Sequence, residues 1–137
     1  MIDYYSFGAS AAAFLIAFVA AGLFTIAFKI IFQATTPYNE MALIRDGNTA
    51  AAITLGAALL GYVLPLASAL THTVTLVEFA VWAVLAGVIQ IVAALVVRRL
   101  VMRDIHDRIV RGDIAAATYM GSISLCVGIL NAACMTN

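Results

Sequence analysis

Four long stretches of this chain contain no Asp, Glu, Lys, Arg or His, and each is long enough to cross a lipid bilayer as a helix. They cover residues 4–28, 47–71, 79–97 and 114–137, whereas a bilayer core needs about 20 apolar residues per helix. Only helices and closed barrels satisfy their own backbone hydrogen bonds in lipid, and continuous apolar runs without two-residue alternation exclude a barrel. The sequence therefore predicts an all-α membrane protein with four transmembrane helices.

The predicted spans are about residues 7–32, 49–71, 75–98 and 114–135, which makes residues 1–137 a single integral membrane domain. Apolar residues make up 65% of the chain and charged residues 10%, well outside the usual soluble range. The connections leave no room for a catalytic ectodomain, a nucleotide-binding fold or a nucleic-acid reader. No Ser/His/Asp arrangement, HExxH motif or P-loop occurs, so we expect a non-enzymatic protein without cofactor, metal or nucleic-acid partner.

The basic residues predict the orientation of the chain in the membrane. All of them fall within residues 29–45 and 98–111, which lie on one side of the predicted membrane. The positive-inside rule assigns that side to the cytoplasm, so both termini are predicted on the outer side of the membrane. Met1-Ile2-Asp3 lacks the basic region of a cleaved signal peptide, so we expect the first span to be retained.

The second half of the chain resembles the first at an offset of 65 residues. Three glycine pairs share this offset: Gly22 with Gly87, Gly47 with Gly112, and Gly56 with Gly121. We interpret this as a duplicated two-helix unit, with copies at about residues 9–70 and 74–135. Two spans return the chain to its starting side, so the two copies are predicted to be parallel, not inverted.

The junction before each second helix of the unit is predicted to be a helix-starting turn. Gly47 and Gly112 suit the left-handed position that ends a helix, and Asn48 and Asp113 follow as N-caps of the next span. These four residues are the predicted helix caps.

Both cytoplasmic loops are predicted to contain short helical segments. In the first loop, Thr36 as N-cap and Pro37 as the first helical residue predict a short interfacial helix that includes Tyr38. In the second loop, opposite charges recur four residues apart, which predicts a charged helix. The pairs are Arg103 with Asp107, Asp104 with Arg108, and Asp107 with Arg111.

The loop residues are also the first candidates for binding. Tyr38, Arg45, Arg103, Arg108 and Arg111 are predicted to contact a peripheral partner or anionic lipid headgroups. A basic residue near an anionic membrane surface contributes about 1 kcal/mol to such binding. The alternative is that this charge only anchors and orients the protein.

A second set of candidates could form a polar pathway. Thr25 and Gln90 occupy aligned positions inside the first and third spans, and His72, Glu78 and Asn131 are expected at one outer depth. The alternatives are an interhelical hydrogen bond for Gln90 and a place in the first turn of the third span for Glu78. Because the spans are so apolar, any channel would have to lie between copies in a homo-oligomer.

Three segments of the chain carry a resemblance to a known family. Thr36-Pro37-Tyr38-Asn39-Glu40, residues 44–52 and residues 131–136 resemble the YjfL-type family of bacterial inner-membrane proteins. This family is a domain of unknown function and supplies no catalytic residues to transfer. Its members are often encoded beside proteins of the phage-shock type, which implies a role in membrane stress or envelope maintenance and a peripheral partner of that type.

Two hypotheses follow. In the first, which we favour, the protein is a membrane platform that recruits a peripheral cytoplasmic protein or organises lipid through its basic loops. In the second, an oligomeric channel or transporter conducts a small ion or solute past the polar residues of the spans.

Overall fold

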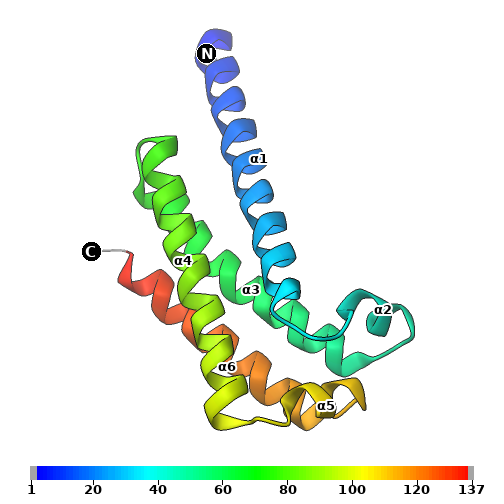
Figure 1. The fold of residues 1–137 in the computed structure, drawn as a ribbon. Coiled ribbons are helices and arrows are strands. Elements are labelled where there is room, and N and C mark those ends of the chain that lie inside the picture. Colours follow the sequence, from blue (N-terminus) through cyan, green and yellow to red (C-terminus); the bar gives the residue numbers. More distant parts are fainter. Residues whose placement is uncertain (1–2, 136–137) are drawn as a thin grey trace.

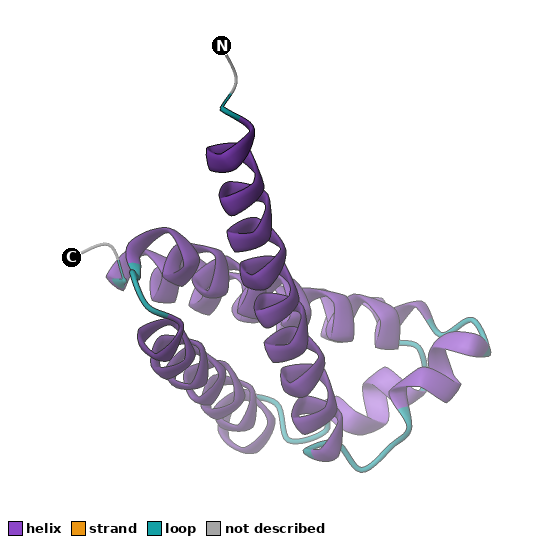
Figure 2. Ribbon diagram, turned by 90° about the horizontal axis from the view of Figure 1, so that it is seen from above, coloured by secondary structure: helices purple, strands orange, loops and turns teal. Residues whose placement is uncertain are grey.

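The computed structural model describes residues 3–135, and they form helices joined by short loops, without a strand (Figure 2). Four helices are long and apolar enough to cross a membrane, which confirms the predicted all-α class with four candidate spans. The elements in chain order are α1 (Tyr4–Ala34), α2 (Glu40–Arg45), α3 (Thr49–His72), α4 (Leu76–Val96), the π-helix η1 (Val97–Val101), α5 (Ile105–Val110) and α6 (Ile114–Cys134).

The two loops that carry the basic residues lie at the same end of the bundle. Figure 1 shows α2 and α5 together at the bottom, with the amino terminus and the turn between α3 and α4 at the opposite end. We call the bottom, formed by residues 35–48 and 97–113, the basic end.

Helices α3 and α6 pack almost backbone to backbone. A Cβ atom added to Gly128 would collide with the carbonyl group of Gly61, and one added to Gly61 would collide with the carbonyl oxygen of Ser124. At Gly121 an added Cβ would lie 2.9 Å from the Cβ of Ala57. Such close approach favours helix association in lipid, where van der Waals packing replaces the hydrophobic drive.

Helix α1 is attached through only one part of its length. Phe28 and Phe32 are its two buried residues, and the Phe28 ring stacks on Tyr62 of α3 with centroids 4.3 Å apart. The amino-terminal half extends away from the other helices (Figure 1) and exposes large apolar side chains such as Phe14 and Leu15. An apolar surface of this kind is suited to hydrocarbon.

The turns that follow α2 and α5 have the same hydrogen-bond pattern. Gly47 and Gly112 both have positive φ angles, 87° and 82°. In each turn the glycine N–H donates to the carbonyl three residues before it, and the next N–H donates to the carbonyl five residues before it. This is the Schellman pattern, which satisfies the last carbonyl groups of a helix.

The residues after these glycines cap the next helices. The Asn48 side chain accepts a hydrogen bond from the Ala51 N–H at 3.0 Å, and Asp113 accepts one from the Ala116 N–H at 3.2 Å. The Asn48 amide also donates to the carbonyl of Ile109 at 2.9 Å, so it joins the two turns.

The start of the first short helix differs from the prediction. Helix α2 begins at Glu40, and its N-cap is Asn39, whose side chain accepts from the Ala42 N–H at 3.1 Å. The predicted cap, Thr36, donates its hydroxyl to the Gln33 carbonyl at the end of α1. Because Thr36 completes the preceding helix, the next cap falls three residues later.

Replacing Gly61 with Ala is expected to destabilise the bundle, because the added methyl group meets the α6 backbone. Overpacking of this kind costs about 1–3 kcal/mol. The matched control is Gly56→Ala in the same helix, where an added Cβ meets nothing within 4 Å. Thermal unfolding in detergent should show a lower midpoint for Gly61→Ala alone, and equal midpoints would contradict the close contact.

Candidate functional site

Charged and polar side chains are buried together at the basic end. Glu40, the first residue of α2, is 2% exposed, and Arg98 of η1 is 6% exposed. Thr35, Tyr38 and His106 lie beside them, and we call these five residues the polar cluster. Burial of charged groups is costly unless they are paired, which makes this cluster the strongest candidate for a function.

The π-helix η1 carries Arg98 into the cluster. One guanidinium nitrogen, Nη1, donates to the Thr35 hydroxyl at 2.8 Å, and the guanidinium carbon lies 4.9 Å from the centre of the Phe32 ring. The other terminal nitrogen, Nη2, is buried and makes no hydrogen bond to the described residues. Arg98 therefore keeps one donor unused, in a type of turn that often marks functional sites.

The Glu40 carboxylate is buried and forms no ion pair with the described residues. Neither of its oxygens has a hydrogen bond of good geometry there, although the Thr36 and Gln33 side chains lie close enough to lower its pKa. Burial raises the pKa of Glu40 above its usual range, and the nearby Thr36, Arg98, Gln33 and Lys29 side chains oppose this only in part.

His106 and Tyr38 complete the cluster through an edge-to-face contact with ring centroids 5.6 Å apart. Burial and then the Arg98 charge lower the pKa of His106, which favours neutral imidazole, and its Nδ1 is buried without a hydrogen-bond partner among residues 3–135. Burial, followed by the Glu40 charge, raises the pKa of Tyr38 to about 12, so Tyr38 keeps its proton at neutral pH.

These groups leave the cluster with unused donors. The raised pKa of Glu40 and the lowered pKa of His106 both favour the neutral forms, so the positive charge of Arg98 is balanced only in part within the cluster. Such an arrangement can bind a proton at Glu40 or an anion at Arg98. No group of three His, Cys, Asp or Glu residues that could hold a metal ion occurs within residues 3–135.

The predicted binding arginines fall into two classes. Arg45, Arg103 and Arg111 are exposed at the basic end. Arg108 is instead held within its own turn, because its Nε donates to Asp113 at 2.9 Å and also lies 3.9 Å from Asp104. The predicted Arg103–Asp107 and Asp107–Arg111 pairs do not form, since Arg103 precedes α5 and Arg111 follows it.

The outer candidates do not gather at one depth. Asn131 donates to the carbonyl of Ala86 at 3.4 Å, and Ala86 lies eight residues further along α4 than Glu78, about 12 Å along the helix axis. The N–H of Glu78 donates to the hydroxyl of Thr75, the N-cap of α4, and the Glu78 carboxylate accepts from the N–H of Val74, the residue before the cap. The Nδ1 atom of His72 lies 2.8 Å from the Ser68 carbonyl oxygen.

Thr25 and Gln90 are bonded separately within the bundle. The Thr25 hydroxyl donates to the Ala21 carbonyl of its own helix at 2.8 Å. The Gln90 amide donates to the Ser124 carbonyl of α6 at 3.2 Å, which matches the alternative of an interhelical hydrogen bond. These contacts do not connect the two side chains into a pathway.

Sequence reasoning missed Glu40 and His106 as site residues and counted Arg98 only as part of the basic charge. One signal was available, because Arg98 directly follows an apolar run and Glu40 is the one glutamate among the basic-end residues. Their burial could not be read from the sequence, since it depends on contacts between segments 58 residues apart.

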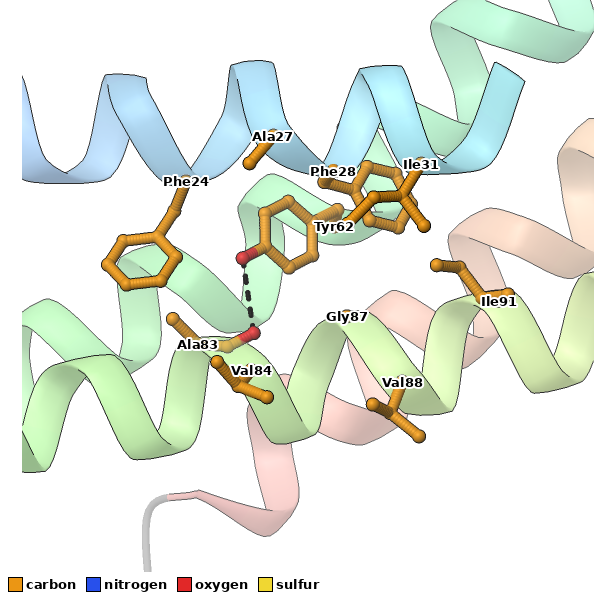
Figure 3. A pocket seen from close by; sticks show the side chains of 10 residues that line it. All are labelled: Phe24, Ala27, Phe28, Ile31, Tyr62, Ala83, Val84, Gly87, Val88 and Ile91. Carbon is orange, nitrogen blue, oxygen red and sulfur yellow. Dashed lines mark hydrogen bonds between the residues drawn. The ribbon is translucent and has the colours of Figure 1, made fainter. Parts of the chain in front are cut away.

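An apolar groove of about 260 Å³ lies between α1, α3 and α4 (Figure 3). The lining residues are Phe24, Ala27, Phe28, Ile31, Tyr62, Ala83, Val84, Gly87, Val88 and Ile91. Tyr62 is the one lining residue with a polar side-chain group, and its hydroxyl donates to the carbonyl of Ala83 at 3.1 Å. The groove therefore presents hydrocarbon almost everywhere.

Replacing Glu40 with Gln is expected to raise the unfolding temperature at neutral pH. A carboxyl group with a raised pKa in the folded state stabilises the protein below its ordinary pKa of 4.5, and that stability is lost as the pH rises through the folded-state pKa. The neutral amide avoids this loss. The gain should therefore shrink as the pH falls toward 4.5.

Thermal unfolding of the detergent-solubilised protein across this pH range checks the expectation. Glu78→Gln is the matched control, because Glu78 is exposed and a glutamine oxygen can still cap the α4 terminus. A gain at Glu40 that does not depend on pH, or an equal gain at Glu78, would contradict the role given to the buried carboxylate.

Comparison with known proteins gives a family match and two relatives, but no solved structure. Residues 6–135 match the family described as Domain of Unknown Function (DUF350). Two proteins named UPF0719 inner membrane protein YjfL, from Escherichia coli strain K12 and from Escherichia coli O157:H7, are each 41% identical to this chain over 111 residues, which cover 81% of this chain and 83% of theirs. No solved structure matches the chain.

Proposed function

Because the chain belongs to the DUF350 family, as the match over residues 6–135 establishes, we propose that it is a multi-pass protein of the bacterial inner membrane that acts as a non-enzymatic platform. The E. coli relatives named as inner membrane proteins support this location. The platform would recruit a peripheral cytoplasmic protein to the basic end. The resemblance implies a partner of the phage-shock type.

The orientation in this proposal rests on the distribution of charge. The basic residues lie in the loops of the basic end or within two helical turns of them, and the positive-inside rule assigns that end to the cytoplasm. Both termini would then lie on the periplasmic side, together with Asp3, His72 and Glu78.

The exposed arginines of the basic end are the observation that carries the proposal. Arg45, Arg99, Arg103 and Arg111 are exposed there. Arg103 is partly ordered, since its Nε donates to the Arg99 carbonyl at 3.0 Å. Exposed guanidinium groups can bind the carboxylates of an acidic partner in a bidentate manner.

The hydrogen bonds of the polar span residues favour the platform over the channel. Thr25, Gln90 and Asn131 each donate to a backbone carbonyl of the bundle, so these donor groups serve packing. A channel would need an oligomer that adds a hydrated path. The exposed apolar surface of α1 supports contacts with lipid or with a second copy, and a homo-oligomeric platform is part of the proposal.

We also infer that the platform arose from a duplicated two-helix unit. Helices α2 and α5 each contain six residues, and both end in glycine turns with positive φ angles. The start points of α2 and α5, and of α3 and α6, differ by 65 residues in both cases. These equivalences support two parallel copies joined at the turn where Asn48 bonds to Ile109.

Replacing Arg103 and Arg111 together with Gln is expected to release the partner, with at least about a tenfold loss in the amount recovered with the purified protein. Each exposed arginine that binds a carboxylate contributes a charge-assisted hydrogen bond. The measurement is purification from native membranes in mild detergent, followed by quantitative mass spectrometry of the bound proteins. Binding should also weaken as salt is raised, because salt screens exposed charges.

Two controls make this experiment specific. Arg103→Lys with Arg111→Lys keeps the charge and should keep more of the partner than the Gln variant. Arg108 is left unchanged, because it braces the α5–α6 turn through Asp113. Retention of the partner by a correctly inserted Gln variant would overturn the platform proposal, and absence of any partner from the parent protein would favour the channel.

A further inference from the structure

The platform proposal gives no role to the apolar groove or to the unpaired hydrogen-bond donors of the polar cluster. They lie next to each other. Ile31 and Ile91 line the same end of the groove (Figure 3). Ile31 lies one helical turn before Thr35, and Thr35 accepts the hydrogen bond from Arg98.

A row of stacked groups connects the groove to the cluster. The Tyr62 ring on the groove wall stacks on Phe28 at 4.3 Å, and Phe28 contacts Phe32 with ring centroids 5.9 Å apart. The Arg98 guanidinium lies over Phe32 at 4.9 Å. The hydrocarbon surface of the groove thus leads directly to a buried positive charge.

The unpartnered atoms of the cluster are suited to an anion. Arg98 Nη2 and His106 Nδ1 are both buried without a hydrogen-bond partner among the described residues. Nη2 carries two N–H groups, and Nδ1 donates in the tautomer that places the imidazole proton there. The raised pKa of Glu40 reduces the negative charge that would otherwise repel an anion and compete for Arg98. A phosphate group offers several acceptor oxygens and a negative charge, and basic pockets between transmembrane helices bind lipid headgroups in this way.

We propose that the groove and the polar cluster together bind one phospholipid from the leaflet at the basic end, with an acyl chain between α1 and α4 and the phosphate at Arg98 and His106. The hydrocarbon groove that ends at the cluster selects a lipid over free phosphate as the source of the anion. The loop of residues 35–39 has no regular secondary structure and supplies Thr35 and Tyr38 to the cluster, so we expect it to shift as the headgroup enters. This site shares no residue with the exposed Arg103 and Arg111.

The proposal is tested with the delipidated full-length protein in detergent, by measuring bound lipid with native mass spectrometry. Three probes separate the contributions: phosphatidylglycerol, diacylglycerol with the same acyl chains, and inorganic phosphate. We expect one phosphatidylglycerol per chain, and binding of diacylglycerol weaker by about tenfold or more because it lacks the phosphate. Inorganic phosphate should not displace the phospholipid.

Variants at the two ends of the site test each half separately. Gly87→Leu fills the groove beside Tyr62, whose ring lies 3.4 Å from the position of an added Cβ. The matched control is Gly22→Leu in α1, where an added Cβ meets nothing within 4 Å. Arg98→Gln removes the charge, and Arg98→Lys keeps it. Gly87→Leu and Arg98→Gln should each reduce bound phosphatidylglycerol by about tenfold, whereas Gly22→Leu should not.

Several outcomes would overturn the proposal. Equal retention by the parent, Gly87→Leu and Arg98→Gln proteins would mean that the lipid is bound only as part of the surrounding annulus. Displacement by inorganic phosphate would mean a site for a soluble anion, and equal binding of diacylglycerol would remove the phosphate from recognition. If Arg98→Gln does not fold, the Gly87→Leu and diacylglycerol measurements still decide between the proposal and its failure.

Discussion

The close contact between α3 and α6 is the constraint on which the rest of this structure depends. In lipid, apolar side chains gain nothing by leaving the solvent, so helices associate where their surfaces fit closely. Gly61 and Gly128 remove the side chains that would keep the two backbones apart. Once these helices are fixed, the turns that precede them meet, and Asn48 bonds to the Ile109 carbonyl. The short helices α2 and α5 are thereby held at one end.

The polar cluster is a consequence of this arrangement. Helix α2 supplies Glu40, η1 supplies Arg98 and α5 supplies His106, so three separate segments bring ionisable groups into one buried space. Leaving buried polar groups without hydrogen-bond partners costs free energy. Unpaired groups in this cluster therefore indicate a ligand or a bound proton more strongly than exposed arginines do. The platform proposal depends on the exposed surface of the basic end, whereas the lipid proposal depends on its interior.

Much of the fold could be predicted because its signals are local. Apolar length predicted the four helices, and the Gly-Asn and Gly-Asp junctions predicted turns that the structure places at Gly47 and Gly112. The candidate site was predicted less well. Arg108 was predicted to contact a partner or lipid headgroups, and the structure adds that Asp113 holds its side chain. Asn131 was predicted at the depth of Glu78, but it bonds to Ala86. Helix packing selects the partner of Asn131, whereas Arg108 finds Asp113 within the turn between α5 and α6.

The sequence by itself determined that this chain forms membrane-spanning helices and that its basic residues share one end, because hydrocarbon length and charge are properties of contiguous residues. Tertiary structure alone decided which of those charges are buried. Arg98 and Arg99 are neighbours in sequence, yet the wide turn of η1 directs Arg98 onto Phe32 and leaves Arg99 exposed. Burial depends on the packing of α1, η1 and α5 around one space, and no contiguous stretch of residues encodes that packing.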